Sequence, residues 1–226
     1  MSRHSWKVVI TVSHIFASMQ WLTVMATVML NVVNAQMMRQ CTCNEIEPCT
    51  HVTADTTLHC MDQCQRHANE VGLSLTAVQQ CFNQVCGPVD SLIRCMKGSV
   101  FTQSCAKGNP IRVPKRYIET FKVALFNEMN NVLTKSGVKN QVMAFLKTGK
   151  KFASCTLNCG QRTFGECQKR HNCGLSLPSD AILVQRLKQC MLSSGLGTTG
   201  VQKICFCLAN SGARQLAGVC NRLVMT

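Results

Sequence analysis

The 226-residue chain has few aromatic residues and few acids. It contains two tryptophans, one tyrosine and nine phenylalanines, and ten Asp and Glu against 24 Lys and Arg. Both tryptophans, Trp6 and Trp21, precede residue 36, so little is left on which bases could stack, and we expect no nucleic-acid partner. The shortage of acids leaves a formal net charge of +14. This charge favours anionic glycans, acidic extracellular proteins or anionic lipid surfaces as partners.

The sequence also lacks familiar catalytic motifs. It has no H-E-x-x-H and no G-x-S-x-G motif. The segment GLGTTG at 195–200 matches a dinucleotide-binding pattern, but it follows a predicted helix and no acid occurs after Asp180. A phospholipase-like enzyme would have a histidine followed by an aspartate, and none of the four later histidines is so followed: His51, His59, His67 and His171. We therefore expect a non-enzymatic protein without a cofactor or a metal.

Residues 1–35 are typical of a secretory signal peptide. Positive residues near the start precede an apolar run from Trp21 to Val33, and small residues lead to Ala35. A retained signal-anchor is the alternative, although His14 and Gln20 interrupt the run that would have to span a bilayer. We expect cleavage, a secreted extracellular protein and no stable membrane span afterwards.

Cysteine is abundant: all 17 cysteines follow residue 40. They make up about a tenth of the chain beyond the signal peptide, a level typical of disulfide scaffolds. In an oxidising compartment such cysteines pair with each other, whereas in the cytosol the same spacing would favour a metal. Their distribution predicts a cysteine-rich helical lobe at 36–105, a cysteine-free helical connector at 106–154 and a second cysteine-rich helical lobe at 155–226.

Apolar residues recur every three or four positions, which predicts an all-α, disulfide-stapled helical bundle. We expect helices at 56–71, after a cap at Ser74, and from Pro88 to Gly98, with irregular segments at 37–57 and 193–200. A long amphipathic helix should occupy the connector. Its apolar stripe is interpreted as core, with a groove for a partner as the alternative: Tyr117, Phe121, Leu125, Met129 and Leu133.

The cysteines of "CMDQC", Cys60 and Cys64, lie one helical turn apart, about 5–6 Å between Cβ atoms, which is too far for a mutual disulfide. Each should bridge outward and clamp its helix to a neighbour, plausibly the one carrying Cys81 and Cys86, or to Cys95. "CTLNC" repeats this spacing in the second lobe. The expected structural disulfides involve Cys60, Cys64, Cys81, Cys86, Cys95, Cys105, Cys155, Cys159, Cys167, Cys173, Cys190, Cys205 and Cys207.

An odd number of cysteines cannot all pair within one chain. We expect a disulfide-linked homodimer through a cysteine near a chain end, with one buried, inert cysteine as the alternative. The inter-chain candidates are Cys41, Cys43, Cys49 and Cys220.

Two kinds of surface site are also predicted. Ser194, in "SSGLG", is a candidate for attachment of a chondroitin or heparan chain. Several basic residues could merge into one anion-binding patch, with a generally basic solvated surface as the alternative: Arg112, Lys115, Arg116, Lys147, Lys150, Lys151, Lys169 and Arg170.

The helical pairs "CMDQC" and "CTLNC", each followed by spaced cysteines behind a signal peptide, resemble nematode secreted cysteine-rich domains of the chondroitin proteoglycan 4 type. The resemblance covers roughly 60–105 and 155–220, and it implies an extracellular-matrix or eggshell component without enzymatic activity.

The expected function is therefore binding, or a structural role in a matrix. The alternative is a secreted ligand or effector that recognises a protein receptor. A clustered basic face would favour a glycan as the partner, and an exposed apolar patch would favour a protein partner. A cleft with a histidine and an acid would favour an enzyme.

Overall fold

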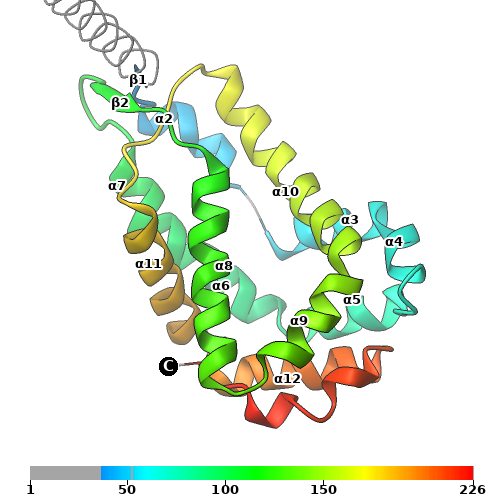
Figure 1. The fold of residues 1–226 in the computed structure, drawn as a ribbon. Helices are drawn as coiled ribbons and strands as arrows, with labels where there is room; N and C mark the ends of the chain where they lie inside the picture. The colour runs from blue at the N-terminus through cyan, green and yellow to red at the C-terminus, as the bar shows by residue number, and fades with distance from the viewer. Residues whose placement is uncertain (1–36, 52, 226) are drawn as a thin grey trace, which may run out of the picture.

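The computed structural model describes residues 37–51 and 53–225, except for the side chains at 163–165 and 167–169. The predicted signal peptide lies outside the described residues. The fold is all-α, as expected (Figure 1). Disulfides hold its helices together. Among the described residues no helix is both long enough and apolar enough to cross a membrane.

Short helical segments make up the first half of the chain. They are α2 (Cys43–Ile46), η1 (Glu47–Thr50), α3 (Ala54–Gln63), α4 (Gln65–Asn69), α5 (Leu75–Asn83), α6 (Cys86–Met96), η2 (Lys97–Phe101, a π-helical turn) and α7 (Thr102–Ser104).

The second half contains the longer helices. They are α8 (Ile118–Lys135), α9 (Lys139–Thr148), α10 (Lys150–Arg170), α11 (Asp180–Ser193) and α12 (Thr198–Asn210), followed by the turns η3 (Arg214–Leu216) and η4 (Cys220–Arg222). Two short strands, β1 (Met37–Arg39) and β2 (Arg112–Pro114), pair antiparallel, with Met38 opposite Val113.

Local sequence signals explain several helix ends. The Ser74 side chain accepts a hydrogen bond from the backbone N–H of Ala77 and caps α5, as predicted. Gly72 and Gly195 have φ of +71° and +82°, a conformation that suits glycine at the end of a helix. The single helix expected at 56–71 is instead two, because the backbone breaks at Cys64 between α3 and α4.

Two further boundaries differ from expectation. The helix predicted to end at Gly98 continues through η2, because that glycine lies inside a π-helical turn and does not adopt a left-handed conformation. The segment 37–57, expected to be irregular, contains β1, α2 and η1. Its local order comes from Thr42, whose side chain accepts from the backbone N–H of Glu45 while the Glu45 carboxylate accepts from the Thr42 N–H.

The disulfides contradict the prediction of two separately stapled lobes. Of the seven disulfides whose two cysteines are both described, five join the first cysteine block to the second: Cys41–Cys173, Cys60–Cys159, Cys64–Cys155, Cys81–Cys207 and Cys95–Cys190. The other two, Cys43–Cys105 and Cys205–Cys220, stay within a block. Spacing along the chain does not determine which block supplies a partner, so the two halves interleave.

Cys60 and Cys64 bridge outward, as predicted, and clamp their helix to a neighbour. The expected neighbour was wrong: both bonds reach α10, through Cys159 and Cys155, rather than α5 or α6. The connector therefore does not end at residue 154, because α10 begins at Lys150 and carries both partner cysteines.

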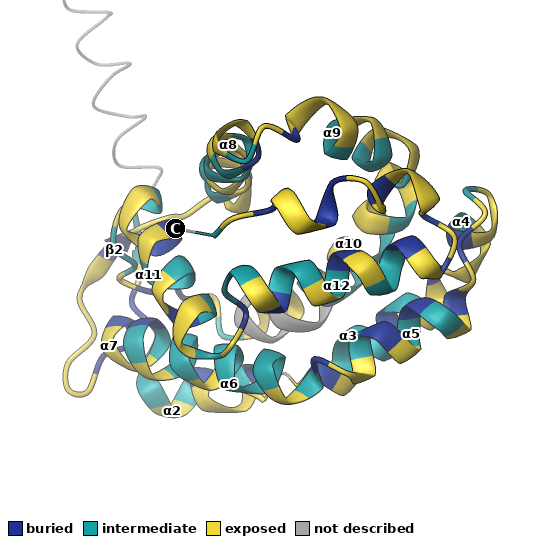
Figure 2. Cartoon of the chain, turned by 90° about the horizontal axis from the view of Figure 1, so that it is seen from below, coloured by how far each residue is buried: buried dark blue, intermediate teal, exposed yellow. Residues whose placement is uncertain are grey.

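Two buried clusters form the core. The larger joins α5, the α8–α9 turn, α12 and the C-terminal segment, and includes Val78, Leu133, Val138, Ala209 and Leu216. The smaller surrounds Cys41 and Cys173 near the strand pair, where Ile46, Cys105 and Leu175 meet. Both contain residues from each half of the chain. Figure 2 shows buried positions recurring along α5 and α12, while α8 is mostly exposed or intermediate.

The helix predicted in the connector is present as α8, but its apolar stripe is core only at one end. Leu133 is 4% exposed, whereas Leu125 is 39% and Tyr117 is 47% exposed. Helix α9 turns the chain back, so the end of α10 returns to the level of the start of α8 (Figure 1). The exposed start of α8 therefore lies at the same end of the molecule as the last turns of α10.

Candidate functional site

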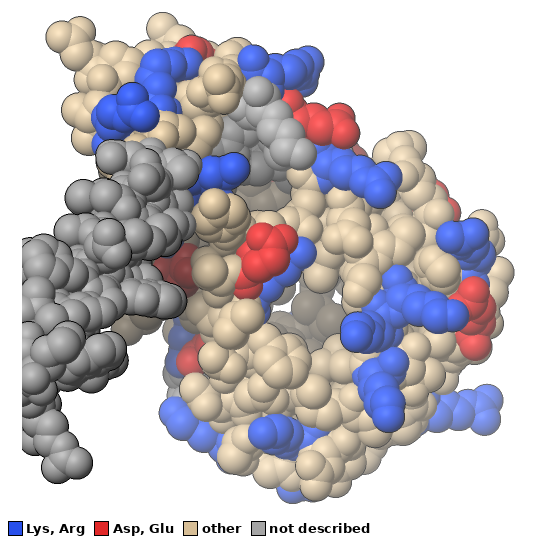
Figure 3. Space-filling view, turned by 45° about the horizontal axis from the view of Figure 1, so that its top comes forward, with Lys and Arg blue, Asp and Glu red and all other residues tan. Residues whose placement is uncertain are grey.

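An open cavity of about 880 Å³ lies between the start of α8, the second half of α10 and the segment 172–177. Its volume falls within the range of about 300–1,000 Å³ that is usual for small-molecule pockets. The space-filling view shows the molecule hollowed near its centre (Figure 3). No sequence argument anticipated this cavity, because its walls come from segments far apart in the chain.

One side of the cavity is apolar. Helix α6 and the π-turn η2 contribute Met96, Val100 and Phe101, and α8 contributes Ile118 and Phe121. Further apolar side chains come from β1, from the segment before α11 and from α11 itself: Met38, Leu175, Leu177 and Leu183. Disulfides tie these segments together, since Cys95–Cys190 joins α6 to α11 and Cys41–Cys173 joins the segment after β1 to residues 172–177.

The described side chains that α10 contributes to the cavity are polar. Asn158, Arg162 and Glu166 are four residues apart and therefore share one face of the helix, and Gln161 lies beside them. Cys159 precedes Arg162 by three positions, does not line the cavity and is bonded to Cys60 of α3. The disulfides to α3 thus set the rotation of α10 about its axis, and this rotation directs the polar stripe into the cavity.

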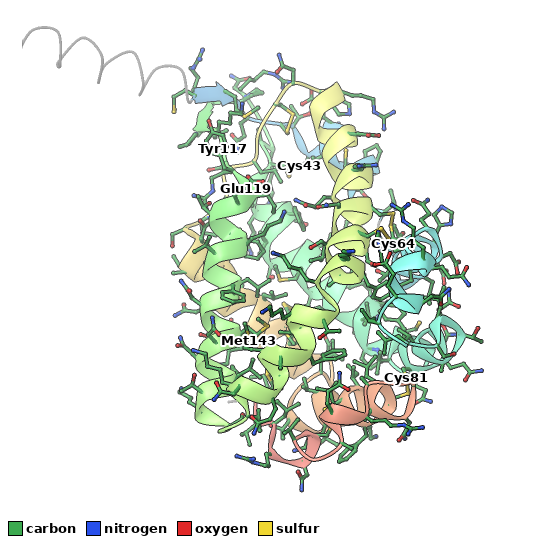
Figure 4. All side chains as sticks on the ribbon, turned by 45° about the vertical axis from the view of Figure 1, so that its right-hand side comes forward. Cys43, Cys64, Cys81, Tyr117, Glu119 and Met143 are labelled. Carbon is green, nitrogen blue, oxygen red and sulfur yellow. A yellow bond between two sulfur atoms is a disulfide. The ribbon has the colours of Figure 1, made fainter. Side chains whose placement is uncertain are left out.

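The described charged side chains around the cavity are three cations and three acids. Arg116 donates from Nη2 to Asp180 Oδ1 at 2.8 Å and to the carbonyl oxygen of Pro178 at 2.7 Å. Lys115 places its Nζ 5.6 Å from the centroid of the Tyr117 ring, a cation–π contact. Tyr117 and Glu119 lie at the same end of α8 (Figure 4).

Four charged groups of the cavity make no ion pair with any residue that the structure describes: Lys115, Glu119, Arg162 and Glu166. Two are cations and two are acids. The lining therefore offers both signs of charge to an occupant.

The predicted anion-binding residues do not form one patch. Lys115 and Arg116 line the cavity, and Arg112 lies on β2, where its Nη2 donates to the Met37 carbonyl oxygen at 3.3 Å. Lys147, Lys150 and Lys151 lie at the α9–α10 junction.

Arg170 and Lys169 end α10, a helix of 21 residues and hence roughly 30 Å long, and the Lys169 side chain is not described. The candidates fall into two groups near opposite ends of α10, and on the visible face basic side chains form separate groups with acids between them (Figure 3). A chain-wide charge excess does not require clustering, because each basic side chain is placed by its own helix.

The inter-chain cysteine candidates are wrong. Cys41, Cys43 and Cys220 bond to Cys173, Cys105 and Cys205, and Cys49 is also disulfide-bonded. Nearness to a chain end did not leave these sulfurs free, because the end segments are packed into the two core clusters.

The unpaired cysteine of the described residues is Cys86, which was expected to bridge. It lies at the start of α6, half-buried, and its Sγ donates to Asn83 Oδ1 at 3.7 Å. Burial raises the pKa of the Cys86 thiol, and the nearby carboxylates of Asp90 and Asp55 raise it further. Parity had indicated that one cysteine must lack a partner in the chain, but not which one. The side chain of Cys167 is not described.

Ser194 forms the C-terminal cap of α11 and is half-buried. The segment GLGTTG connects α11 to α12, as expected, although α12 already begins at Thr198. The attachment of a glycan at Ser194 stays a prediction.

The four histidines in the described part of the chain lie outside the cavity lining. His67 Nδ1 is 3.4 Å from Glu70, His51 Nε2 is 3.9 Å from Glu47, and the ring of His59 contacts the Gln63 amide at 3.0 Å. The carbonyl oxygen of His171 accepts from Arg39 at 3.1 Å. Among the described side chains, no group of three or more His, Cys, Asp or Glu could hold a metal ion.

Sequence reasoning interpreted Tyr117 and Phe121 as core and missed their place in the cavity. The available signal was the charge around them: Lys115, Arg116 and Glu119 lie within the same short stretch. Such charges also occur beside the apolar stripe of an ordinary amphipathic surface helix, so this signal alone could not identify a pocket. The residues from β1, α6 and 172–177 carried no comparable signal.

No protein-family model matches the chain, and no curated protein or solved structure matches it either.

Proposed function

We propose that the protein is a secreted, non-enzymatic binding protein whose helices hold a preformed cavity for an apolar or amphiphilic small molecule. The observation that carries this proposal is the open cavity of about 880 Å³ with one apolar wall. A ligand that covers exposed apolar side chains such as Ile118 removes them from water. This stabilises the complex by about 25 cal/mol for each Å² of apolar surface buried.

The disulfides support a binding role. Cys95–Cys190, Cys41–Cys173 and the two bonds from α3 to α10 hold the walls of the cavity in place. A rigid pocket loses little conformational entropy when it binds a ligand, which favours affinity. A high disulfide content also suits an extracellular location.

A fluorescence titration with the neutral apolar probe N-phenyl-1-naphthylamine tests the proposal. We expect saturable binding at one site. Phe121→Arg should weaken it at least tenfold, because the substitution places a guanidinium group in the apolar lining. Val123→Arg is the matched control, since Val123 lies on the same helix, is 61% exposed and does not line the cavity. Absence of saturable binding, or equal losses in both variants, would contradict the proposal.

Binding of an anionic glycan is a second candidate. It is favoured by three exposed lysines at the α9–α10 junction, Lys147, Lys150 and Lys151, although Lys151 Nζ is also 3.2 Å from Glu70. Replacing Lys150 and Lys151 by Glu should lower the salt concentration that elutes the protein from heparin. The charge-matched control replaces Lys107 and Lys203 by Glu, and an equal decrease there would show that only net charge matters.

A further inference from the structure

The cavity is amphiphilic in its construction. Helices α6, α8 and α11 and the segment 172–177 supply apolar side chains, whereas the described cavity residues of α10 are Asn158, Gln161, Arg162 and Glu166. A purely apolar ligand would leave this polar stripe desolvated without partners, which costs free energy. A ligand with a polar head and an apolar tail satisfies both walls.

The charges define the head more closely. Arg116 and Asp180 satisfy each other at 2.8 Å. Among the described side chains this leaves one cation and one acid near the start of α8, Lys115 and Glu119, and one of each on α10, Arg162 and Glu166. A head with only negative charge would pair with the cations and repel the two carboxylates. A head with only positive charge would pair with the carboxylates and repel the two cations. A neutral head would leave all four groups without a charged partner.

On these grounds we propose that the cavity binds a single-chain amphiphile with a zwitterionic head of one phosphate and one ammonium group, such as a lysophospholipid. This inference rests on the proposed function and adds the class of ligand to it. The tail lies on the wall formed by Val100, Phe121 and Leu183, and the head lies against α10.

The side chains suit the two parts of that head. Arg162 offers a planar fork of donors that matches phosphate oxygens, and Lys115 supplies a second positive charge. The carboxylates of Glu166 and Glu119 carry the charge opposite to that of the ammonium group and can form an ion pair with it, and the Tyr117 ring offers it an aromatic face. The cavity volume lies in the upper part of the range for small-molecule pockets, which favours one acyl chain over two.

Isothermal titration of the secreted chain with three lipids of equal chain length tests the inference. The lipids are a lysophosphatidylcholine, a fatty acid and a monoacylglycerol, each kept below its micelle concentration. We expect the lysophosphatidylcholine to bind at least tenfold more tightly than the other two. Sedimentation with phosphatidylcholine vesicles separates uptake of a free lipid from attachment to a bilayer, and attachment without uptake would overturn the inference.

Variants of the polar stripe provide the second arm. Arg162→Gln and Glu166→Gln should each weaken lysophosphatidylcholine binding about tenfold, since each removes a charge-assisted contact. Neither should weaken binding of N-phenyl-1-naphthylamine, which is uncharged and makes no charge-assisted contact with the stripe. Arg170→Gln is the matched control, because Arg170 is an exposed arginine of the same helix that does not line the cavity.

The outcomes separate this inference from the proposed function. Equal affinity for the three lipids, or unchanged lipid binding in both stripe variants, would overturn the inference of a zwitterionic head. The proposal that the apolar cavity is a binding site would then still stand. Failure to bind every lipid and the apolar probe would overturn both.

Discussion

At the scale of single residues, Cys86 is chemically distinct from the disulfide-bonded cysteines. Its thiol is half-buried beside Asp90 and Asp55, and both burial and the negative charges raise its pKa. Because the thiolate is the reactive form, the native thiol should react slowly near neutral pH.

We expect iodoacetamide to modify one described cysteine in the native protein, Cys86, more slowly than it modifies an unhindered thiol at pH 7.5, with a rate that rises as pH increases. Cys86→Ser should remove this modification. A band at twice the monomer mass that disappears on reduction, and that is lost in Cys86→Ser, would instead show that Cys86 links two chains.

Glu45 is the second residue with an unusual ionisation. Its carboxylate accepts from both terminal nitrogens of Arg39, at 2.8 and 2.9 Å, and from the Thr42 backbone N–H at 2.8 Å. The bonds from Arg39 come first among the causes, and together these contacts lower the pKa of Glu45 from 4.5 to about 2.

A lowered pKa means that the folded state favours the ionised carboxylate. Its contribution to stability is complete above pH 4.5, the ordinary pKa, and is lost as the pH falls through about 2. In Glu45→Gln this part of the acid dependence should be missing. Denaturant unfolding at a series of pH values measures it, and a carboxyl NMR titration with a midpoint near 4.5 would contradict the expectation.

At the scale of elements, the α3–α10 pair is closed by two disulfides one helical turn apart. Cys60–Cys159 and Cys64–Cys155 close loops of 99 and 91 residues that share nearly the whole intervening chain. In the chain-entropy model a loop of that size contributes about 4–5 kcal/mol. Once the first bond is closed, the second closes a loop of only about 8–10 residues and contributes about 2–3 kcal/mol.

We therefore expect non-additive losses. Replacing either pair by alanine should lower the free energy of unfolding by about 2–3 kcal/mol, whereas replacing all four cysteines should lower it by about 4 kcal/mol more. Guanidinium unfolding without reductant measures the three variants. A loss in the four-cysteine variant equal to the sum of the two single-pair losses would show that the bonds act independently, through local packing.

At the scale of the whole molecule, the crossing disulfides make the two halves interdependent. Both core clusters combine residues from before 106 with residues from beyond 170, as with Val78 and Ala209 in the larger cluster. We expect that residues 36–105 and 155–226, produced separately under oxidising conditions, give no cooperative thermal transition, because each loses most of its disulfide partners. A cooperative transition in either half by circular dichroism would contradict this.

The sequence alone determined the features that depend on a few neighbouring residues. Apolar residues that recur every three or four positions predicted helices, and Ser74 and Gly72 predicted a helix cap and a helix end. The spacing of Cys60 and Cys64 excluded a bond between them. The structure confirms each of these predictions. Such features follow from backbone geometry within one or two turns. Secretion and the matrix role stay predictions.

Tertiary structure alone decided the features that depend on distant segments. Cys60 pairs with Cys159, Cys86 has no disulfide partner, and Phe121 lines a cavity although its helical period resembles that of a core residue. The sequence could not predict these outcomes, since the same local pattern is compatible with many pairings. Which sulfurs meet, and which apolar faces are left facing a cavity, is determined by the packing of segments about 90–130 residues apart.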